Sequence, residues 1–216
     1  MKIDWQNIDT VLLDMDGTLL DLHFDSYFWM QHLPQVYAQK KDITVDQANA
    51  LLKPIFIENE KTLNWYSIPF WSQTLGFDIM QHKADVAHNI AYRENAQEFL
   101  TQCRQNSDDL RMITNGHRQV LDLKIQHTQI DQYFDQLICS HELNYPKEHL
   151  SFWQNLQNMQ AFDPQRTLFI DDSEYVLDVA AQYGIAHIYS IAKPDSSRER
   201  LEPSKFPMIE SFKLIV

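Results

Sequence analysis

Cysteine is scarce in this chain of 216 residues, which contains only Cys103 and Cys139. The two do not form a CxxC pair, so their spacing excludes the usual cysteine-based metal and redox motifs. Each lies in or beside an apolar stretch of the kind that a helix or a strand buries. We therefore expect two buried free thiols and no disulfide.

Basic residues are also few, because 18 Lys and Arg stand against 30 Asp and Glu, a formal net charge of −12. Such a charge repels nucleic-acid backbones and anionic membranes unless a basic patch is concentrated somewhere, and the sequence has no such patch. Nucleic acids and membranes are thereby excluded as partners. An acidic protein that handles phosphate esters must offset the repulsion locally, through a metal ion, a lysine and backbone N–H groups.

Long hydrophobic runs, linkers and repeats are missing as well. No segment approaches the ~20 apolar residues of a membrane span, and the N-terminal sequence MKIDWQNIDT has no long apolar stretch typical of a signal peptide. We expect a cytoplasmic protein. The length suits one core with a smaller appendage, and the sequence does not indicate its oligomeric state.

Short apolar runs that end at polar residues recur along the chain, and they are typical of buried strands in a parallel sheet. They span residues 10–13, 110–113, 137–139, 167–170 and 187–191. Segments of helical periodicity lie between them, at 119–129, 150–159 and 175–183. This alternation predicts an α/β fold with a Rossmann-like, doubly wound parallel sheet.

The first two predicted strands are much further apart than the dozen or so residues that a crossover needs. Helix-like stretches fill the gap at residues 28–39, 45–60 and 80–91. We predict a helical cap at 22–95, inserted through hinges near 21–25 and 92–95 into a core made of residues 1–21 and 96–216. Residues 193–207 are predicted to form a polar surface loop.

Two carboxylates, Asp14 and Asp16, follow the first predicted strand, where parallel α/β sheets bind their ligands. Side chains two residues apart on an extended segment point the same way, so the pair repels itself unless a cation or a proton shares the site. One carboxylate can attack phosphorus while the other, with a raised pKa, protonates the leaving oxygen and later activates water. Gly17 lets the backbone turn closely beneath a phosphate.

Two plainer interpretations of this motif are a surface turn and a calcium loop. Asp-x-Asp-Gly occurs in ordinary turns, but here it follows a strand predicted to be buried. A calcium loop requires a Gly at its sixth position and a Glu at its twelfth, and the stretch from Asp14 has neither. The motif therefore favours catalysis.

The next two strand ends carry groups that suit an anion. Thr114, Asn115 and Gly116 offer a hydroxyl, an amide and backbone N–H groups that can cradle phosphate oxygens, although Thr and Asn also cap helices routinely. Lys147 follows the third strand and could neutralise both a phosphoryl group and an attacking carboxylate. A lysine after a proline is, however, usually exposed to solvent.

A second pair of acids, Asp171 and Asp172, ends the fourth predicted strand, with Asp178 one to two helical turns on. Together with the first pair these oxygen donors indicate a hard cation, and Mg²⁺ is the ion that keeps open positions for phosphate. No His or Cys cluster in the sequence points to zinc instead.

These four signals, in their order, resemble the haloacid dehalogenase superfamily of phosphotransferases over essentially the whole chain. The resemblance implies that Asp14 is the nucleophile, Asp16 the general acid and base, and Lys147 the charge stabiliser. It places Thr18 and Thr114 near the phosphoryl group. It also implies a Mg²⁺ site made by Asp14, the main-chain carbonyl of Asp16, Asp171 and Asp172.

Two departures from the family pattern are visible. Lys147 follows Pro146, whereas many members have the lysine before the proline. The fourth motif is Asp-Asp-Ser where Gly-Asp-Ser is usual, which leaves open whether Asp171 or Asp172 contacts the metal directly.

Longer strings are similar to the bacterial GMP/IMP-specific 5′-nucleotidases of this superfamily: LLDMDGTLLDLHFDSYFW, KTLNWYSIPFWSQTLG, YPKE and RTLFIDDSEYVLDVAAQYGI. This resemblance implies a purine nucleotide substrate. Aromatic residues that could stack on its base, or could equally pack the cap's own core, are Tyr27, Trp29, Trp65, Tyr66, Phe70 and Trp71. His23 and Asp25 could also border the pocket.

Other functions stay open on this fold. A phosphatase for a sugar phosphate or for phosphoglycolate would have the same catalytic acids. A dehalogenase needs no proton donor, so Asp16 argues against one. A non-catalytic binding protein would be expected to lack Asp14 or Asp16, and this chain has both.

Overall fold

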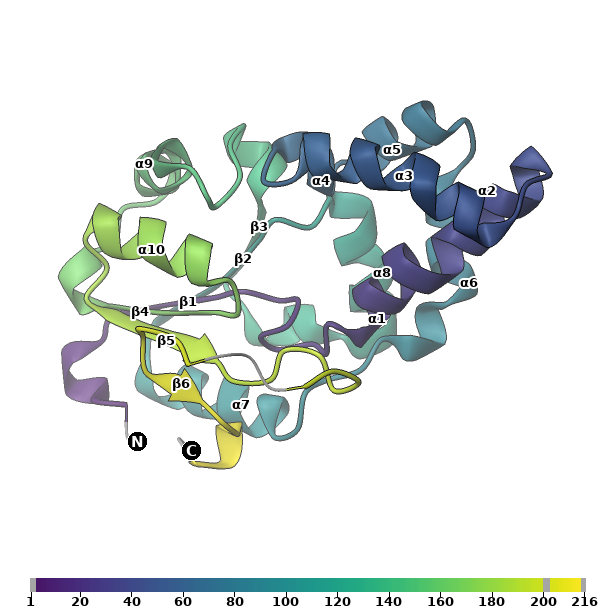
Figure 1. Cartoon of the computed structure of the whole chain (residues 1–216). Helices are drawn as coiled ribbons and strands as arrows, with labels where there is room; N and C mark the ends of the chain where they lie inside the picture. Colours follow the sequence, from purple (N-terminus) through teal and green to yellow (C-terminus); the bar gives the residue numbers. More distant parts are fainter. Residues whose placement is uncertain (1–2, 200–202, 215–216) are drawn as a thin grey trace.

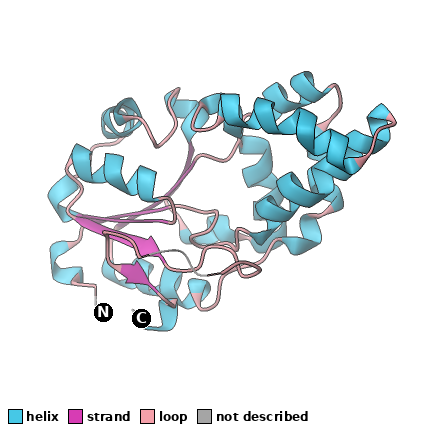
Figure 2. Cartoon of the chain, viewed as in Figure 1, coloured by secondary structure: helices cyan, strands magenta, loops and turns pink. Residues whose placement is uncertain are grey.

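The computed structural model describes residues 3–199 and 203–214. Six parallel strands form its sheet, in the order β3-β2-β1-β4-β5-β6 (Figures 1 and 2). The strands are β1 (Thr10–Leu13), β2 (Asp109–Thr114), β3 (Gln136–Cys139), β4 (Thr167–Asp171), β5 (His187–Ile191) and β6 (Met208–Ile209). The α/β prediction and its five strands are confirmed, while the two-residue β6 was too short to show as a sequence pattern.

Helices cover both faces of the sheet because alternate strand residues point to opposite sides. Val11 and Leu13 pack toward α7 (Ala96–Asn106) and α8 (Arg118–Thr128), whereas Leu12 packs toward the opposite helices. Those are α9 (Leu150–Met159) and α10 (Glu174–Tyr183), above the sheet in Figure 1. Burial on both faces explains why the strands are continuous apolar runs. The predicted buried thiols, Cys103 and Cys139, are free and belong to the same apolar cluster as Val11 and Leu13.

Most of the segment between β1 and β2, before α7, is a separate group of helices at the right of Figure 1. It contains α1 (His23–Tyr27), a π-helix (Phe28–His32), α2 (Leu33–Lys41), α3 (Val45–Asn59), α4 (Leu63–Tyr66), α5 (Ile68–Leu75), α6 (Ile79–Asp85) and a 3-10 turn (Ala87–Asn89). These helices share one apolar cluster, which extends to Val120 of α8. The predicted cap limits at residues 22 and 95 stay a prediction. Among the described residues, no helix combines the length and apolarity needed to cross a bilayer.

Two helix predictions in this segment were inaccurate. The predicted helix 28–39 begins as a π-helix, in which the N–H of Leu33 bonds the carbonyl of Phe28, and Pro34 has no N–H to continue an α-helical pattern there. The predicted helix 80–91 ends at Asp85, because Val86 leaves helical geometry at φ −112° and ψ 11°. Single-residue backbone geometry of this kind is not visible in an apolar pattern.

The predicted hinges lie side by side: the N–H of Asp21 donates to the carbonyl of Ala91 at 2.9 Å, and that of Arg93 donates to Leu19 at 2.9 Å. The loop at 193–207, of which residues 200–202 lie outside the described part, has no helix or strand. Its description as a surface loop is wrong for Pro194 and Asp195, which are buried. The carbonyl of Pro194 accepts the N–H of Leu22 at 3.0 Å, so this loop packs against the first hinge.

Candidate active site

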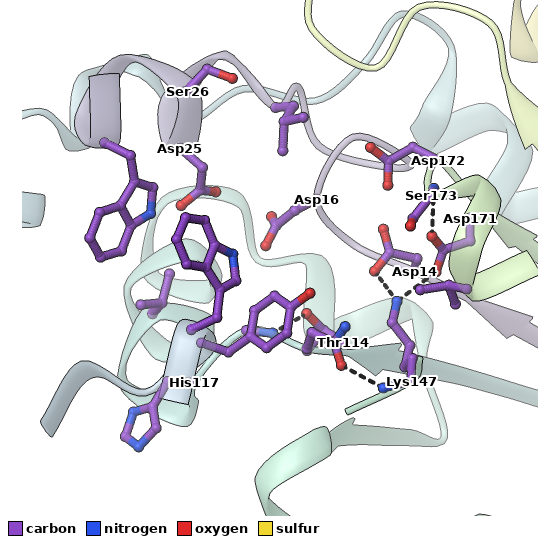
Figure 3. A pocket seen from close by; sticks show the side chains of 18 of the residues that line it. Asp14, Asp16, Asp25, Ser26, Thr114, His117, Lys147, Asp171, Asp172 and Ser173 are labelled. Atoms are coloured by element: carbon purple, nitrogen blue, oxygen red, sulfur yellow. Dashed lines mark hydrogen bonds and ion pairs between the residues drawn. The ribbon is translucent and has the colours of Figure 1, made fainter. Parts of the chain in front are cut away.

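A cavity of about 410 Å³ lies where the carboxyl ends of β1, β2 and β4 face the helices of the inserted segment (Figure 3). Eight of the nine predicted site residues line it: Asp14, Asp16, Thr114, Asn115, Gly116, Lys147, Asp171 and Asp172. The ninth, Thr18, does not line the cavity and is fully buried. The structure thus brings together residues from four separate loops, as the parallel sheet predicts.

Asp14 is fixed directly beyond β1, where its N–H donates to the carbonyl of Ile170 at 3.0 Å. Its Oδ1 accepts from the ammonium of Lys147 at 2.5 Å, while Oδ2 is buried and has no hydrogen-bond partner in the described part of the chain. Burial raises the pKa of Asp14 to about 6; Lys147 opposes the rise and the charge of Asp171 adds to it. A buried carboxylate oxygen without a partner is costly, so it indicates a position built for a ligand.

Lys147 is 2% exposed, so the solvent-exposed alternative is excluded. Its Nζ donates to Asp14 Oδ1, to Asp171 Oδ2 at 2.6 Å and to the carbonyl of Ile113 at 3.3 Å. Burial lowers the pKa of Lys147, but the two carboxylates outweigh it and raise that pKa above its usual value. The Pro-Lys order therefore still places an ammonium against the carboxylate of Asp14.

Asp14, Asp171 and Asp172 form a candidate cation site. Each can offer a carboxylate oxygen, and these oxygens lie within 4.8 Å of one another. Burial raises the pKa of Asp172 well above its ordinary value, and the negative charges of Asp171 and Asp14 raise it further. The backbone of Gly17 lies directly against the Asp172 carboxylate. It has φ +83°, and a Cβ at this position would collide with that carboxylate. A donor set of crowded carboxylate oxygens fits Mg²⁺.

Asp178 does not belong to this site, which corrects the prediction that it helps to outline it. Its carboxylate pairs with Lys205, and it does not line the cavity. The reason is helical phase: α10 begins at Glu174, and its inward positions are Val176, Leu177 and Ala180.

Asp16 lies beside Asp14 but its carboxylate has a different partner. Oδ1 accepts from Lys124 of α8 at 2.5 Å, and Figure 3 places Asp16 between Asp14 and Asp25. Burial raises the pKa of Asp16 to about 6; Lys124 opposes the rise, and Asp25 and Asp14 add to it. The repulsion expected between the two acids is thus relieved for Asp16 by a lysine that the sequence argument did not single out.

Glu148 and Tyr66 connect the inserted helices to the loops that follow β2 and β3. The Tyr66 hydroxyl donates to Glu148 Oε1 at 2.5 Å, and Asn115 Nδ2 donates to Oε2 at 2.8 Å. Asn115 also accepts the backbone N–H of Lys147 through Oδ1 at 2.9 Å. Asn115 therefore positions the loop of Lys147 as well as lining the cavity. The sequence argument did not single out Glu148, although its position directly after Lys147 could have indicated that it lies near the site.

The candidate stacking residues divide into two groups. Trp29, Trp65 and Tyr66 line the cavity, whereas Tyr27, Phe70 and Trp71 do not. Trp71 is fully buried and donates its indole N–H to the carbonyl of Trp65 at 2.7 Å, so it packs the segment's own core. Asp25 lines the cavity and His23 does not.

The fold also assembles a group that sequence spacing did not predict. His32, His82 and Asp85 each offer a possible ligand atom, and these atoms lie within 4.8 Å of one another. None of the three lines the cavity. This group lies apart from the cavity, so it does not compete with the oxygen donors around Asp14.

Solved structures share this architecture. The HAD phosphatase of Thermococcus onnurineus is 20% identical, covers 95% of each chain and has a TM-score of 0.77. The HAD hydrolase YfnB of Bacillus subtilis, solved bound to magnesium, is 16% identical with a TM-score of 0.64 over 96% of each chain. At these identities the likeness establishes the fold.

Sequence similarity establishes the family. The model for haloacid dehalogenase-like hydrolases matches residues 11–189. The chain belongs to this family and is a phosphoric monoester hydrolase. It is similar to a protein named GMP/IMP nucleotidase YrfG from Escherichia coli K12, at 36% identity over 216 residues, which cover 100% of this chain and 97% of that protein.

Proposed function

We propose that this chain hydrolyses purine nucleoside 5′-monophosphates, with GMP and IMP as its preferred substrates, through an aspartyl-phosphate on Asp14. The observation that carries the proposal is that one cavity is lined by charged residues at one end and by aromatic residues at the other. Asp14, Lys147 and Asp171 form an anion-handling end, while the aromatic side chains of Trp29 and Trp65, which stack on each other, line the same cavity. The similarity to YrfG over the full length supports this choice of substrate.

In the first step a carboxylate oxygen of Asp14 attacks phosphorus, and the bond from phosphorus to the nucleoside 5′-oxygen breaks. Asp16 gives its proton to that oxygen, so the nucleoside leaves as a neutral alcohol. Lys147 holds Asp14 Oδ1 at 2.5 Å, which fixes the carboxylate and offsets negative charge as the two anions approach. Thr114, Asn115 and Gly116 line the side where phosphate oxygens would bind.

In the second step water attacks the phosphoryl group of the acyl phosphate, and Asp16 accepts the proton of that water. Inorganic phosphate leaves, and the Asp14 carboxylate is regenerated. Asp14, Asp171 and Asp172, with the main-chain carbonyl of Asp16, would hold Mg²⁺, which when bound supplies positive charge against the phosphate oxygens.

The substrate proposal is tested by measuring phosphate release in the presence of Mg²⁺ from purine and pyrimidine 5′-monophosphates, sugar phosphates and phosphoglycolate. We expect kcat/KM to be highest for GMP and IMP. A sugar phosphate or phosphoglycolate as the best substrate would overturn the nucleotidase proposal and leave the hydrolase intact. Release from none of these compounds would also overturn the nucleotidase proposal.

Replacing Lys147 by Met should lower kcat/KM by about 10²-fold, because charge stabilisation of the transferring group is lost at constant side-chain volume. The measurement is steady-state phosphate release at saturating Mg²⁺. Lys205→Met is the matched control, since Lys205 pairs with an aspartate outside the cavity and its side chain is 59% exposed. A Lys147→Met enzyme within about threefold of the parent would contradict the role given to this lysine.

A further inference from the structure

Four charged side chains form a continuous chain that runs from the active site into the inserted helices. Asp16 Oδ1 accepts from Lys124 Nζ at 2.5 Å, and the same ammonium donates to Asp25 Oδ2 at 2.6 Å. Asp25 Oδ1 accepts from Lys83 Nζ at 2.7 Å. The order is therefore Asp16 carboxyl, Lys124 ammonium, Asp25 carboxylate and Lys83 ammonium.

This arrangement is tightly constrained because its two lysines are buried. The side chains of Lys124 and Lys83 are 1% and 2% exposed. Burying a charge is favourable only when its partners are well placed, so each member fixes the position of the next. Aromatic rings add to the constraint: Lys124 Nζ lies 5.1 Å from the centroid of Phe24, and Lys83 Nζ lies 4.5 Å from that of Phe28.

These linked ion pairs join elements that are far apart in the sequence. Asp16 belongs to the loop after β1, and Lys124 belongs to α8, which packs on the sheet. Asp25 lies on α1 and Lys83 on α6, both in the inserted segment. Figure 3 shows Asp25 and Asp16 facing one another, with Asp14 on the far side of Asp16. The position of α1 and α6 is thereby tied to one carboxylate of the active site.

We propose that Lys124 and Asp25 are positioning residues for Asp16: Lys124 fixes the orientation of its carboxylate, and Asp25, held by Lys83, fixes Lys124. The orientation of Asp16 toward the leaving oxygen then depends on the placement of α1 and α6 over the sheet. This inference rests on the proposed function, in which Asp16 protonates that oxygen.

The test uses Asp25→Asn, which keeps the shape of the side chain and removes its charge. Two substrates are compared by kcat/KM. This quantity reports the steps up to and including the first irreversible step, which here is the departure of the leaving group. A nucleoside 5′-oxygen needs a proton to leave, whereas p-nitrophenolate leaves without one. We expect a loss of about tenfold or more with IMP and of less than about threefold with p-nitrophenyl phosphate.

Arg111→Met is the control for a general loss of stability. Arg111 is 1% exposed and binds both oxygens of Asp109 at 2.7 and 2.5 Å, but it does not line the cavity. Its replacement removes a buried ion pair without altering the ratio between the two substrates. If Asp25→Asn fails to fold, Lys83→Met provides the same comparison, because it removes only the outermost charge. Equal losses on both substrates would overturn the inference.

A double-mutant cycle separates the inference from the proposed function on which it rests. Asp16→Asn alone must lose far more kcat/KM with IMP than with p-nitrophenyl phosphate; without that difference the proposed role of Asp16 fails. Given that difference, adding Asp25→Asn to Asp16→Asn should cost less than about twofold more, because Asp25 acts through Asp16. Losses that multiply in the double variant would overturn the inference and leave the role of Asp16 intact.

Discussion

Asp14→Asn should abolish turnover, with kcat reduced by at least about 10⁴-fold, while the protein remains folded. An amide oxygen is a poor nucleophile and cannot regenerate a carboxylate after phosphoryl transfer. The fold should survive because Asp14 stands among like charges, and burial together with Asp171 already disfavours its charged form. Lys147 keeps its second carboxylate partner, Asp171, at 2.6 Å. Phosphate release from the best substrate and the melting temperature are the two measurements.

The control for this prediction is Asp178→Asn, which makes the same chemical change on α10 outside the cavity. It should leave kcat within about twofold of the parent. The mass of the purified Asp14→Asn protein must show that the asparagine has not deamidated back to aspartate. Turnover near that of the parent, in protein of the correct mass, would be incompatible with Asp14 as the nucleophile.

Removal of divalent metal should have the next largest effect. Dialysis against EDTA is expected to lower phosphate release by at least about 10³-fold, and Mg²⁺ should restore it. The physical reason is the crowding of Asp14, Asp171 and Asp172, whose oxygens lie within 4.8 Å of one another and repel an incoming phosphate ester. Undiminished phosphate release by the metal-free protein would refute a metal-dependent reaction.

Binding can be measured apart from activity. Mg²⁺ should raise the melting temperature of the parent, since an ion that binds only the folded state stabilises it. Asp171→Asn and Asp172→Asn should reduce that shift, and the larger reduction identifies the acid that contacts the ion directly. In the control Asp178→Asn, the shift should match that of the parent. Equal shifts in all four proteins would place the ion elsewhere.

The fold and the grouping of polar residues at one edge of the sheet could be predicted, because both depend on local patterns. A strand buried on both faces has to be a continuous apolar run, and the polar residues after such runs meet at one edge of a parallel sheet. That rule predicts that Asp14, Thr114 and Asp171 lie together, and all three line the cavity. It failed for Asp178, because its helical phase turns it toward Lys205.

The connection to the inserted helices could not be predicted, because it depends on pairs distant in sequence. Asp25 lies 58 residues from Lys83 and 99 from Lys124, and no local pattern links them. One signal was available: Lys124 shares the buried stripe of α8 with Val120 and Leu121, and a lysine on an apolar stripe requires a buried partner. The identity of that partner came only from the fold.

The sequence also could not show which aromatic residues line the cavity. Trp65, Tyr66, Phe70 and Trp71 are close in the sequence and chemically alike, so composition cannot separate cavity from core. Trp65 and Tyr66 at the end of α4 line the cavity, as does Ile68 at the start of α5, while Phe70 and Trp71 further along α5 do not. Which of these rings borders the cavity therefore follows from the fold and not from the sequence pattern.

The most direct test of the account is to trap the covalent intermediate. Asp16→Asn enzyme with Mg²⁺ and p-nitrophenyl phosphate, whose leaving group needs no proton, is quenched in acid within milliseconds and digested, and the masses of the peptides are measured. Because the amide in this variant cannot take a proton from water, the acyl phosphate should accumulate, and one phosphoryl group should appear on the peptide that contains Asp14. A phosphoryl group on another residue, or none on any peptide while phosphate is still released, would contradict nucleophilic catalysis by Asp14.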